Sequence, residues 1–303
     1  LFSAEHPEVL PETADFLRLL QEQTERLTQM TKTLLEMTWP EVDALRKKTD
    51  IAMLSTGAVE QHGYHLPLGC DTIQSTESLR YAHDILLEKY GVESLIAPTI
   101  QFGICPGAMC YPGSITLRTS TLIAVLEDVC EGLYHHGFKN IILFLGHDEN
   151  YASSMVAAQN VVDRHNDAKV VVLNPMPALK ASERSSLKLD KNPRPDGHGG
   201  AGEASRGLCC HPNLVYLDLA QDDHWDPAKV VASEPILGGE PPLLGGGVYN
   251  PANEGRSYSY AAGDPGQTGD PSSASAEAGV KAFTAMAEVV AKIAYKLFVQ
   301  DKK

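Results

Sequence analysis

Residues 140–150 read NIILFLGHDEN, a continuous apolar run that passes directly into a glycine and a set of polar side chains. An uninterrupted run of this kind predicts a strand buried on both faces, as in a parallel sheet. A second apolar run, IAMLST at 51–56, leads into the polar loop GAVEQHGYHLPLGCD at 57–71. In α/β sheets, ligands bind beyond the carboxyl ends of the strands, so both loops are candidate binding loops.

The rest of the chain alternates between strand and helix patterns. Further strands are predicted at 94–98 and 169–174, and helices at 12–37, 72–90, 119–136, 151–166 and 275–299. Alternation of this kind predicts an α/β sandwich with a largely parallel sheet. We interpret residues 1–36 as an N-terminal helical arm and residues 37–303 as the main domain. The Gly- and Pro-rich stretch 234–271 is interpreted as a long functional loop.

Composition excludes several classes of partner. The net charge of −14 argues against a nucleic-acid partner, because phosphate binding needs clustered Lys and Arg. No apolar stretch approaches the roughly 20 residues that span a bilayer. The first residues lack the basic start and apolar core of a signal peptide. The six cysteines form no CxxC pair, which favours reduced thiols. We therefore expect a cytoplasmic protein that acts on a small molecule.

Both candidate loops carry side chains that bind metals. Glu60 and His62 are two residues apart, as are His147 and Glu149, and in an extended segment such pairs point to one face. Asp71 would then bridge between them. Three carboxylates and one hydroxide carry four negative charges, which two divalent cations neutralise. Mixed imidazole and carboxylate ligands suit Zn, Mn or Fe, so we expect two such ions per chain.

Either pair alone often arises by chance. Their position in glycine-flanked turns directly after apolar strands favours the functional interpretation. Five motifs also resemble those of the creatininase family in the same order. These are EQHGYHLPLGCD at 60–71 (EQHGPHLPLGTD in the family), YPGS at 111–114 (FPGT), GHDEN at 146–150 (GHxEN), HGGAGEAS at 198–205 (HAGxxETS) and GDPSSASAEAG at 269–279 (GDPxxASAExG).

The resemblance implies a three-layer α/β/α sandwich and a creatininase-like catalytic domain over 37–303. It also implies a homo-oligomer, with a hexamer as the family's common assembly. It assigns Glu60, Asp71 and His147 to one metal ion, and His62, Asp71 and Glu149 to the other. Members of the family hydrolyse amides, often cyclic or formamide-like.

The mechanism expected of such a pair is attack by a hydroxide that bridges the two ions, with one ion polarising the carbonyl. His198 is then the predicted proton shuttle. Glu203 is either a hydrogen-bond partner of the ligands or an additional ligand. His65 is expected to support the 57–71 loop without binding a metal itself. Tyr111, in the YPGS motif, is predicted to contact the substrate.

Some positions depart from the family pattern. Gly197 stands where creatininase has a catalytic Glu, and Asp196 is a candidate substitute. Asp148 replaces an aromatic residue in GHxEN, which favours recognition of hydroxyl or amine groups. The only tryptophans are Trp39 and Trp225, and neither lies in the region that covers creatinine in creatininase. Creatinine itself is therefore not the expected substrate.

Three functions follow from these residues. The first is hydrolysis of a cyclic or formamide-type amide in a small polar molecule. The second is ring opening of an oxidised cyclitol of the inosose type, through a carbon–carbon bond. The third is a non-catalytic metal-binding scaffold, against which the complete ligand set and His198 both argue.

Overall fold

The structure is a computed structural model that describes residues 31–175, 197–221, 265–267 and 269–300. The chain divides into two compact units, Leu1–Lys32 and Thr33–Lys303, and the elements below belong to the second. The strands are β1 (Ile51–Thr56), β2 (Leu95–Ile96), β3 (Asn140–Leu145) and β4 (Lys169–Leu173). The α-helices are α2 (Trp39–Leu45), α3 (Cys70–Tyr90), α4 (Thr119–His135), α5 (Tyr151–Arg164), α8 (Ala201–Cys210) and α10 (Ala276–Ala294). Short 3-10 turns are η1 (Leu34–Glu36), η2 (Pro106–Cys110), η3 (Asp148–Asn150), η4 (Pro212–Leu214), η5 (Leu217–Leu219) and η7 (Pro271–Ser273), and η8 (Tyr295–Val299) is a π-helical turn.

The four strands form one parallel sheet in the order β2-β1-β3-β4. β1 and β3 pair along their whole length, from Ile51 opposite Asn140 to Thr56 opposite Leu145. From β1 the chain passes to β2 on one side, and β3 then adds on the other side of β1. The strand order therefore switches between β1 and β3, and such a switch leaves a crevice at the carboxyl ends of the two strands.

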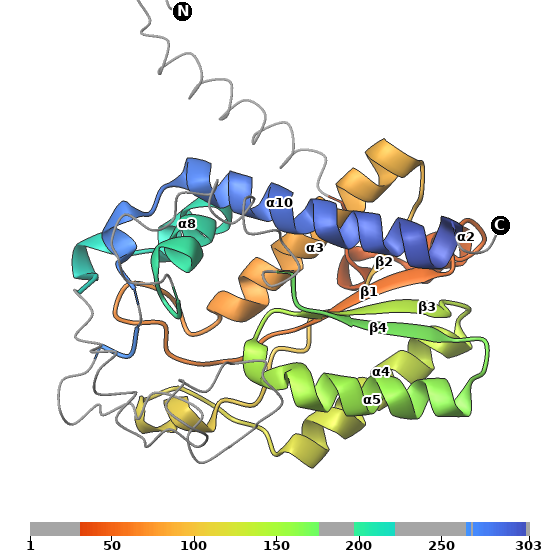
Figure 1. The fold of residues 1–303 in the computed structure, drawn as a ribbon, viewed down its shortest axis with the longest axis horizontal. Helices are drawn as coiled ribbons and strands as arrows, with labels where there is room; N and C mark the ends of the chain where they lie inside the picture. Colours follow the sequence, from red (N-terminus) through yellow and green to blue (C-terminus); the bar gives the residue numbers. More distant parts are fainter. Residues whose placement is uncertain (1–30, 176–196, 222–264, 268, 301–303) are drawn as a thin grey trace, which may run out of the picture. The chain divides into compact units, whose positions relative to one another are not determined.

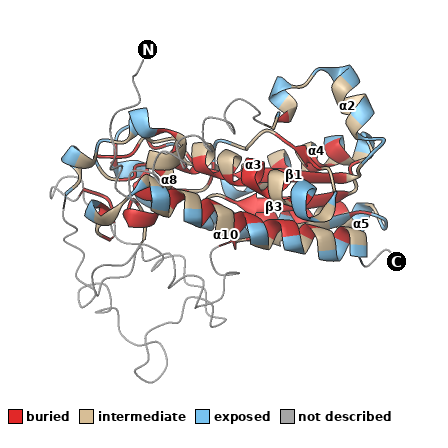
Figure 2. Cartoon of the chain, turned by 90° about the horizontal axis from the view of Figure 1, so that it is seen from above, coloured by how far each residue is buried: buried red, intermediate tan, exposed pale blue. Residues whose placement is uncertain are grey.

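Helices cover both faces of this sheet, with α3 and α10 on one face and α4 and α5 on the other (Figure 1). Successive strand residues point to opposite faces. Met53 and Phe144 accordingly pack with α3 and α10, whereas Leu54 and Leu143 pack with α4 and α5. β1 and β3 are buried throughout (Figure 2). The predicted three-layer α/β/α sandwich with a parallel sheet is confirmed.

Glycines let α3 approach the strand ends. A Cβ on Gly57, just after β1, would lie 2.7 Å from Thr72 Oγ1. A Cβ on Gly146, just after β3, would lie 2.5 Å from the Cβ of Ser75. Neither position tolerates a side chain without displacement of α3. The first turns of α3 therefore sit directly against both candidate loops.

Several predicted boundaries need correction. Residues 31–33 are not helical and Leu34–Glu36 form a 3-10 turn, so the helix predicted at 12–37 is wrong over its last residues. Pro40 does not terminate that helix; it lies in the first turn of α2, which Thr38 and Glu41 cap. β2 is shorter than predicted, and α8 was not predicted at all. The remainder of the predicted arm helix and most of the loop 234–271 lie outside the described residues.

No helix in the described part of the chain is long and apolar enough to cross a membrane. All six cysteines are free thiols, in agreement with the expectation of reduced cysteines.

Candidate metal centre

Two loops converge on the crevice between β1 and β3. Glu60 and His62 lie in the loop after β1, and Asp71 lies in the first turn of α3 that follows it. The Glu60 N–H donates to the Leu68 carbonyl at 3.0 Å, which closes this loop on itself. His147 directly follows Gly146 at the end of β3. The backbone thus brings both predicted ligand pairs to the same edge of the sheet.

Asp71 lies between the two histidines. Its Oδ1 is 3.1 Å from His62 Nε2, and its Oδ2 is 3.1 Å from His147 Nδ1. Glu60 Oε1 approaches the same His147 nitrogen at 3.2 Å. Potential ligand atoms of Glu60, Asp71 and His147 all lie within 4.8 Å of one another. These are the three residues predicted to hold one metal ion.

Glu149 is placed less tightly than the other four. Its carboxylate is 3.9 Å from His147 Nε2, the nitrogen that faces away from Glu60 and Asp71, and its side chain is 37% exposed. Within the described residues it forms no compact ligand group with His62 and Asp71. The predicted second set is therefore only partly assembled, with Glu149 at the solvent side.

The three histidines of the centre share one arrangement. His62 Nδ1 donates to the Glu60 carbonyl at 3.1 Å, and His147 Nε2 donates to the Ile104 carbonyl at 2.7 Å. His198 Nε2 likewise meets the carbonyl of Gln61. In each ring the other nitrogen then faces a carboxylate of the cluster. Metal-binding histidines characteristically donate their second ring N–H in this way, which fixes the tautomer and the ring orientation.

The charges in the cluster shift its pKa values strongly. Burial disfavours a charged His62, but the carboxylates of Asp71 and Glu203 outweigh burial and raise its pKa to about 10. Burial likewise opposes protonation of His147, yet Glu60 and Asp71 raise its pKa well above the usual range. For Asp71 the two histidines outweigh burial and lower the pKa. Without a metal, protonated imidazoles would supply the positive charge that these carboxylates require.

The donor set fits divalent cations. Asp71 Oδ2 is buried and accepts no hydrogen bond from the described residues, despite its closeness to His147. A buried carboxylate oxygen left in this state is costly unless a cation or a donor compensates it. Cys70 also lies near His62 and Glu203, but burial raises the pKa of its thiol well above the usual value. Since the thiolate is the ligand form, the cluster favours oxygen and nitrogen ligation.

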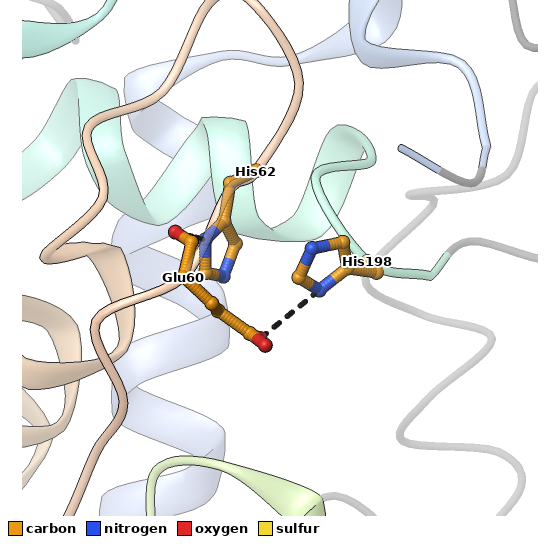
Figure 3. Close-up of side chains that lie close together, drawn as sticks. All are labelled: Glu60, His62 and His198. Carbon is orange, nitrogen blue, oxygen red and sulfur yellow. Dashed lines mark hydrogen bonds and ion pairs between the residues drawn. The ribbon is translucent and has the colours of Figure 1, made fainter. Parts of the chain in front are cut away.

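His198 joins the cluster from a different part of the chain, just before α8. Figure 3 shows its ring beside Glu60 and His62, with Nδ1 3.5 Å from Glu60 Oε1. The His62 and His198 ring centroids are 4.3 Å apart. Burial and the neighbouring His62 lower the pKa of His198. The predicted proton shuttle therefore lies at the cluster with one ring nitrogen facing a candidate ligand.

A cavity of about 420 Å³ opens over the cluster and is large enough for a small molecule. Its wall includes Glu60, Asp71, His147, Asp148 and His198. Asp148 is exposed, and Asn174 Nδ2 donates to its Oδ1 at 2.7 Å. The protein atoms around the carboxyl partly desolvate it and so raise its pKa.

Comparison with known proteins identifies the family. The profile of the family Creatininase, described as creatinine amidohydrolase, matches residues 35–294. The chain belongs to the creatininase family. It is 30% identical to the creatinine amidohydrolase of Pseudomonas putida over 206 residues, which are 62% of this chain and 75% of the relative. It is 24% identical to the 3-dehydro-scyllo-inosose hydrolase of Thermotoga maritima over 187 residues, 61% of this chain and 58% of that protein.

A solved structure titled "Creatininase Mn" is similar with a TM-score of 0.68 and 26% identity, over 88% of this chain and all of the other. The family resemblance inferred from the motifs is therefore confirmed, and the chain is a metal-dependent hydrolase of the creatininase family.

The remaining predicted site residues of this family member lie in different positions. Glu203 is 3.7 Å from His62 Nε2, and its Oε2 accepts the Gly199 N–H at 2.7 Å. His65 is fully buried behind the loop, where a Cβ on Gly63 would meet its ring at 2.9 Å. Tyr111 is buried, and it is absent from the cavity wall, to which its neighbours in η2 contribute. Asp196 lies outside the described residues.

Sequence reasoning missed two polar side chains that hold the centre together. Gln61 accepts the Gly63 N–H at 2.9 Å and donates to the Gly266 carbonyl at 2.7 Å, so it joins the metal loop to a distant segment. Asn150 accepts the Ile104 N–H and donates to the Gly57 carbonyl, both at 2.9 Å. Both lie within the motifs that carry the candidate ligands, Gln61 in EQH and Asn150 in GHDEN, and this position was the signal that could have identified them.

Proposed function

We propose that this creatininase-family protein is a binuclear hydrolase that cleaves an amide bond, cyclic or formamide-like, in a small polar molecule. The shared orientation of His62, His147 and His198 carries the proposal. Each ring turns one nitrogen to a backbone carbonyl and the other to a carboxylate. Three rings set in this way in one buried acidic cluster support metal binding better than they support a solely structural network.

Glu60, Asp71 and His147 would hold one ion, and His62, Asp71 and Glu149 the other. When bound, divalent ions supply Lewis-acid activation of a carbonyl oxygen and of a water molecule. Asp71 would belong to both ligand sets, because one of its oxygens faces His62 and the other faces His147. Glu149, whose side chain is 37% exposed, would be the most solvent-accessible of these ligands.

The chain's own groups would orient the substrate and move a proton. His198 Nδ1 faces the cluster and is placed to transfer a proton to the leaving nitrogen, while its Nε2 is held by Gln61. Asp148 opens into the cavity with one oxygen fixed by Asn174, which leaves acceptor capacity for an amine or hydroxyl of the substrate.

A second candidate is ring opening of an oxidised cyclitol. Asp148 supports it, since a carboxylate recognises hydroxyls better than it recognises a flat apolar ring. The similarity to the Thermotoga maritima 3-dehydro-scyllo-inosose hydrolase also supports this second candidate. We also propose, in line with the expectation from the sequence, that the chain works as a cytoplasmic homo-oligomer.

Metal analysis and a substrate screen test these proposals together. The purified protein should carry close to two transition-metal ions per chain, and loading with Mn or Zn should raise its activity. Formamides, lactams and ketocyclitols would be assayed side by side with creatinine as a comparison. At most trace metal after loading, with no gain in activity on any class, would refute the binuclear hydrolase. Turnover of ketocyclitols alone would favour the second candidate.

A further inference from the structure

The buried face of α3 is polar over its first two turns. Gln74, Ser75 and Ser78 follow Asp71 at helical spacing, and their exposed fractions are 4%, 3% and 2%. The same face becomes apolar from Leu79 onward. A buried polar group costs free energy unless it is hydrogen-bonded, so such a stripe calls for a partner that is itself polar.

One such partner is Arg206 on α8. Its Nε donates to Gln74 Oε1 at 2.7 Å, and Gln74 Nε2 in turn donates to the Glu203 carbonyl at 2.8 Å. The Arg206 side chain is only 15% exposed. Among the described residues, its terminal N–H groups make no hydrogen bond, since the nearest carboxylate oxygen, Glu203 Oε1, is 3.6 Å from Nη2. Gln74 therefore fixes the guanidinium through Nε, and the N–H groups on Nη1 and Nη2 remain able to donate to a ligand.

These groups face the same cavity as the metal cluster. Arg206, Gln74, Ser75 and Ser78 line its wall together with Asp71. Arg206 is also its only Lys or Arg lining residue within the described chain. Gln74, which holds Arg206, lies three residues after Asp71, or about 4.5 Å along a helix at 1.5 Å per residue. A substrate whose amide sits at the cluster would thus reach Arg206 with a group a short spacer away.

We propose that Arg206 binds a carboxylate of the substrate, so that the substrates are small amides carrying a carboxylate a short spacer from the scissile carbonyl. This inference rests on the proposed hydrolase function and names its substrate class. The guanidinium presents a planar fork that matches a carboxylate with two parallel hydrogen bonds. Glu203 and Asp148 in the same wall would repel a doubly charged phosphate more than a singly charged carboxylate.

A purely structural role for Arg206 would be to neutralise Glu203. The contacts favour binding instead. Arg206 Nη2 and Glu203 Oε1 form an ion pair at 3.6 Å, but this distance is too long for a hydrogen bond and leaves the Nη2 N–H groups unused within the described residues. Glu203 Oε2 accepts the Gly199 N–H at 2.7 Å. The hydrogen bond to Gln74 also holds Arg206 against α3, where the other small polar side chains line the cavity.

A matched pair of probes tests the inference independently of turnover. N-acetyl-β-alanine and its uncharged carboxamide carry the same amide and spacer and differ only in the carboxylate. Calorimetric titration of each into the metal-loaded protein gives the ratio of the two Kd values. The variants are Arg206→Gln, Arg206→Lys and, as a control, Arg46→Gln, which removes an arginine from the end of α2, outside the cavity.

Wild type and the Arg46 variant should bind the carboxylate about 10- to 100-fold more tightly than the carboxamide, as expected for hydrogen bonds to a charged group. Arg206→Gln should abolish this preference with unchanged metal content, and Arg206→Lys should keep part of it. Equal affinities in wild type, absence of measurable binding, or a preference that survives Arg206→Gln would overturn the inference. In the last case the carboxylate would be bound by the metals. Arg206-dependent preference without hydrolysis of any amide would instead count against the proposed function alone.

Discussion

Replacing Asp71 with Asn tests the metal centre most directly. The substitution keeps the side-chain volume and removes one negative charge from the position where both oxygens lie 3.1 Å from a histidine nitrogen. An amide cannot reproduce two anionic contacts, so affinity for the ions should fall by at least the 10- to 100-fold typical of losing a partner of a metal ligand. Turnover should fall with it.

The expected size of the effect follows from mass action. Metal at about 100 times the wild-type Kd stabilises the folded state by about 2.7 kcal/mol. A 100-fold weaker site under the same conditions gains only about 0.4 kcal/mol. For a domain of this size, about 1 kcal/mol shifts Tm by roughly 2–4 °C, so Mn or Zn should raise the wild-type Tm by roughly 5–10 °C. A 100-fold loss of affinity would reduce this rise to roughly 1–2 °C in Asp71→Asn.

The assay is thermal melting with and without Mn or Zn, alongside metal content and kcat/KM. Asp128→Asn is the matched control, because Asp128 is exposed on α4, away from the cluster. It should respond to metal as wild type does. An Asp71→Asn protein with the full metal-dependent rise in Tm and wild-type turnover would refute the assignment of Asp71 as the central ligand.

Three further predictions concern the surroundings of the cluster. Glu149→Gln should lose about one equivalent of metal by elemental analysis and most activity, with a small change in metal-free Tm because the side chain is 37% exposed; full retention of both ions would contradict its role. Asp148→Asn should raise KM for amine- or hydroxyl-bearing substrates and leave metal content unchanged, whereas equal kinetics would argue against substrate recognition there. Gly63→Ala and Gly91→Ala both place alanine at positive φ, 74° and 66°, which costs roughly 1–2 kcal/mol in each case. Only the Gly63 methyl would clash, because it would lie 2.5 Å from Gln267 Oε1. Only Gly63→Ala should therefore also lose metal and activity. Equal losses in both variants would contradict the role of close packing at Gly63.

Much of the fold and most of the candidate ligand cluster were predictable because the signals are local. β1 and β3 have the predicted bounds, since strands covered on both faces by helices must be apolar at every position. Glu60, His62 and His147 follow these strands within a few residues, and paired parallel strands end at the same edge of the sheet. Three of the five predicted ligands therefore meet without any further information, and Asp71 joins them from the first turn of α3.

The errors also have local causes. The leucine-rich segment before Met37 fits a helical period, yet Thr33 and Thr38 each begin a new turn with a capping glutamate three residues later. α8 was missed because Gly199 and Gly200 precede it and Gly202 and Gly207 lie within it, and glycine disfavours helices in isolation. There, packing against α3 and α10 supplies the stabilisation that the local sequence lacks.

The sequence by itself determined the class of fold, the order of its elements and which loops carry the candidate ligands, because periodicity and motif spacing act over a few residues. Only the tertiary structure decided which nitrogen of each histidine faces the carboxylates, that Glu149 stands apart, and that Gln74 meets Arg206 across 132 residues of chain. Contacts of that kind depend on how the helices pack on the sheet. The packing results from burial of apolar surface over the whole domain, and no short stretch of sequence encodes it.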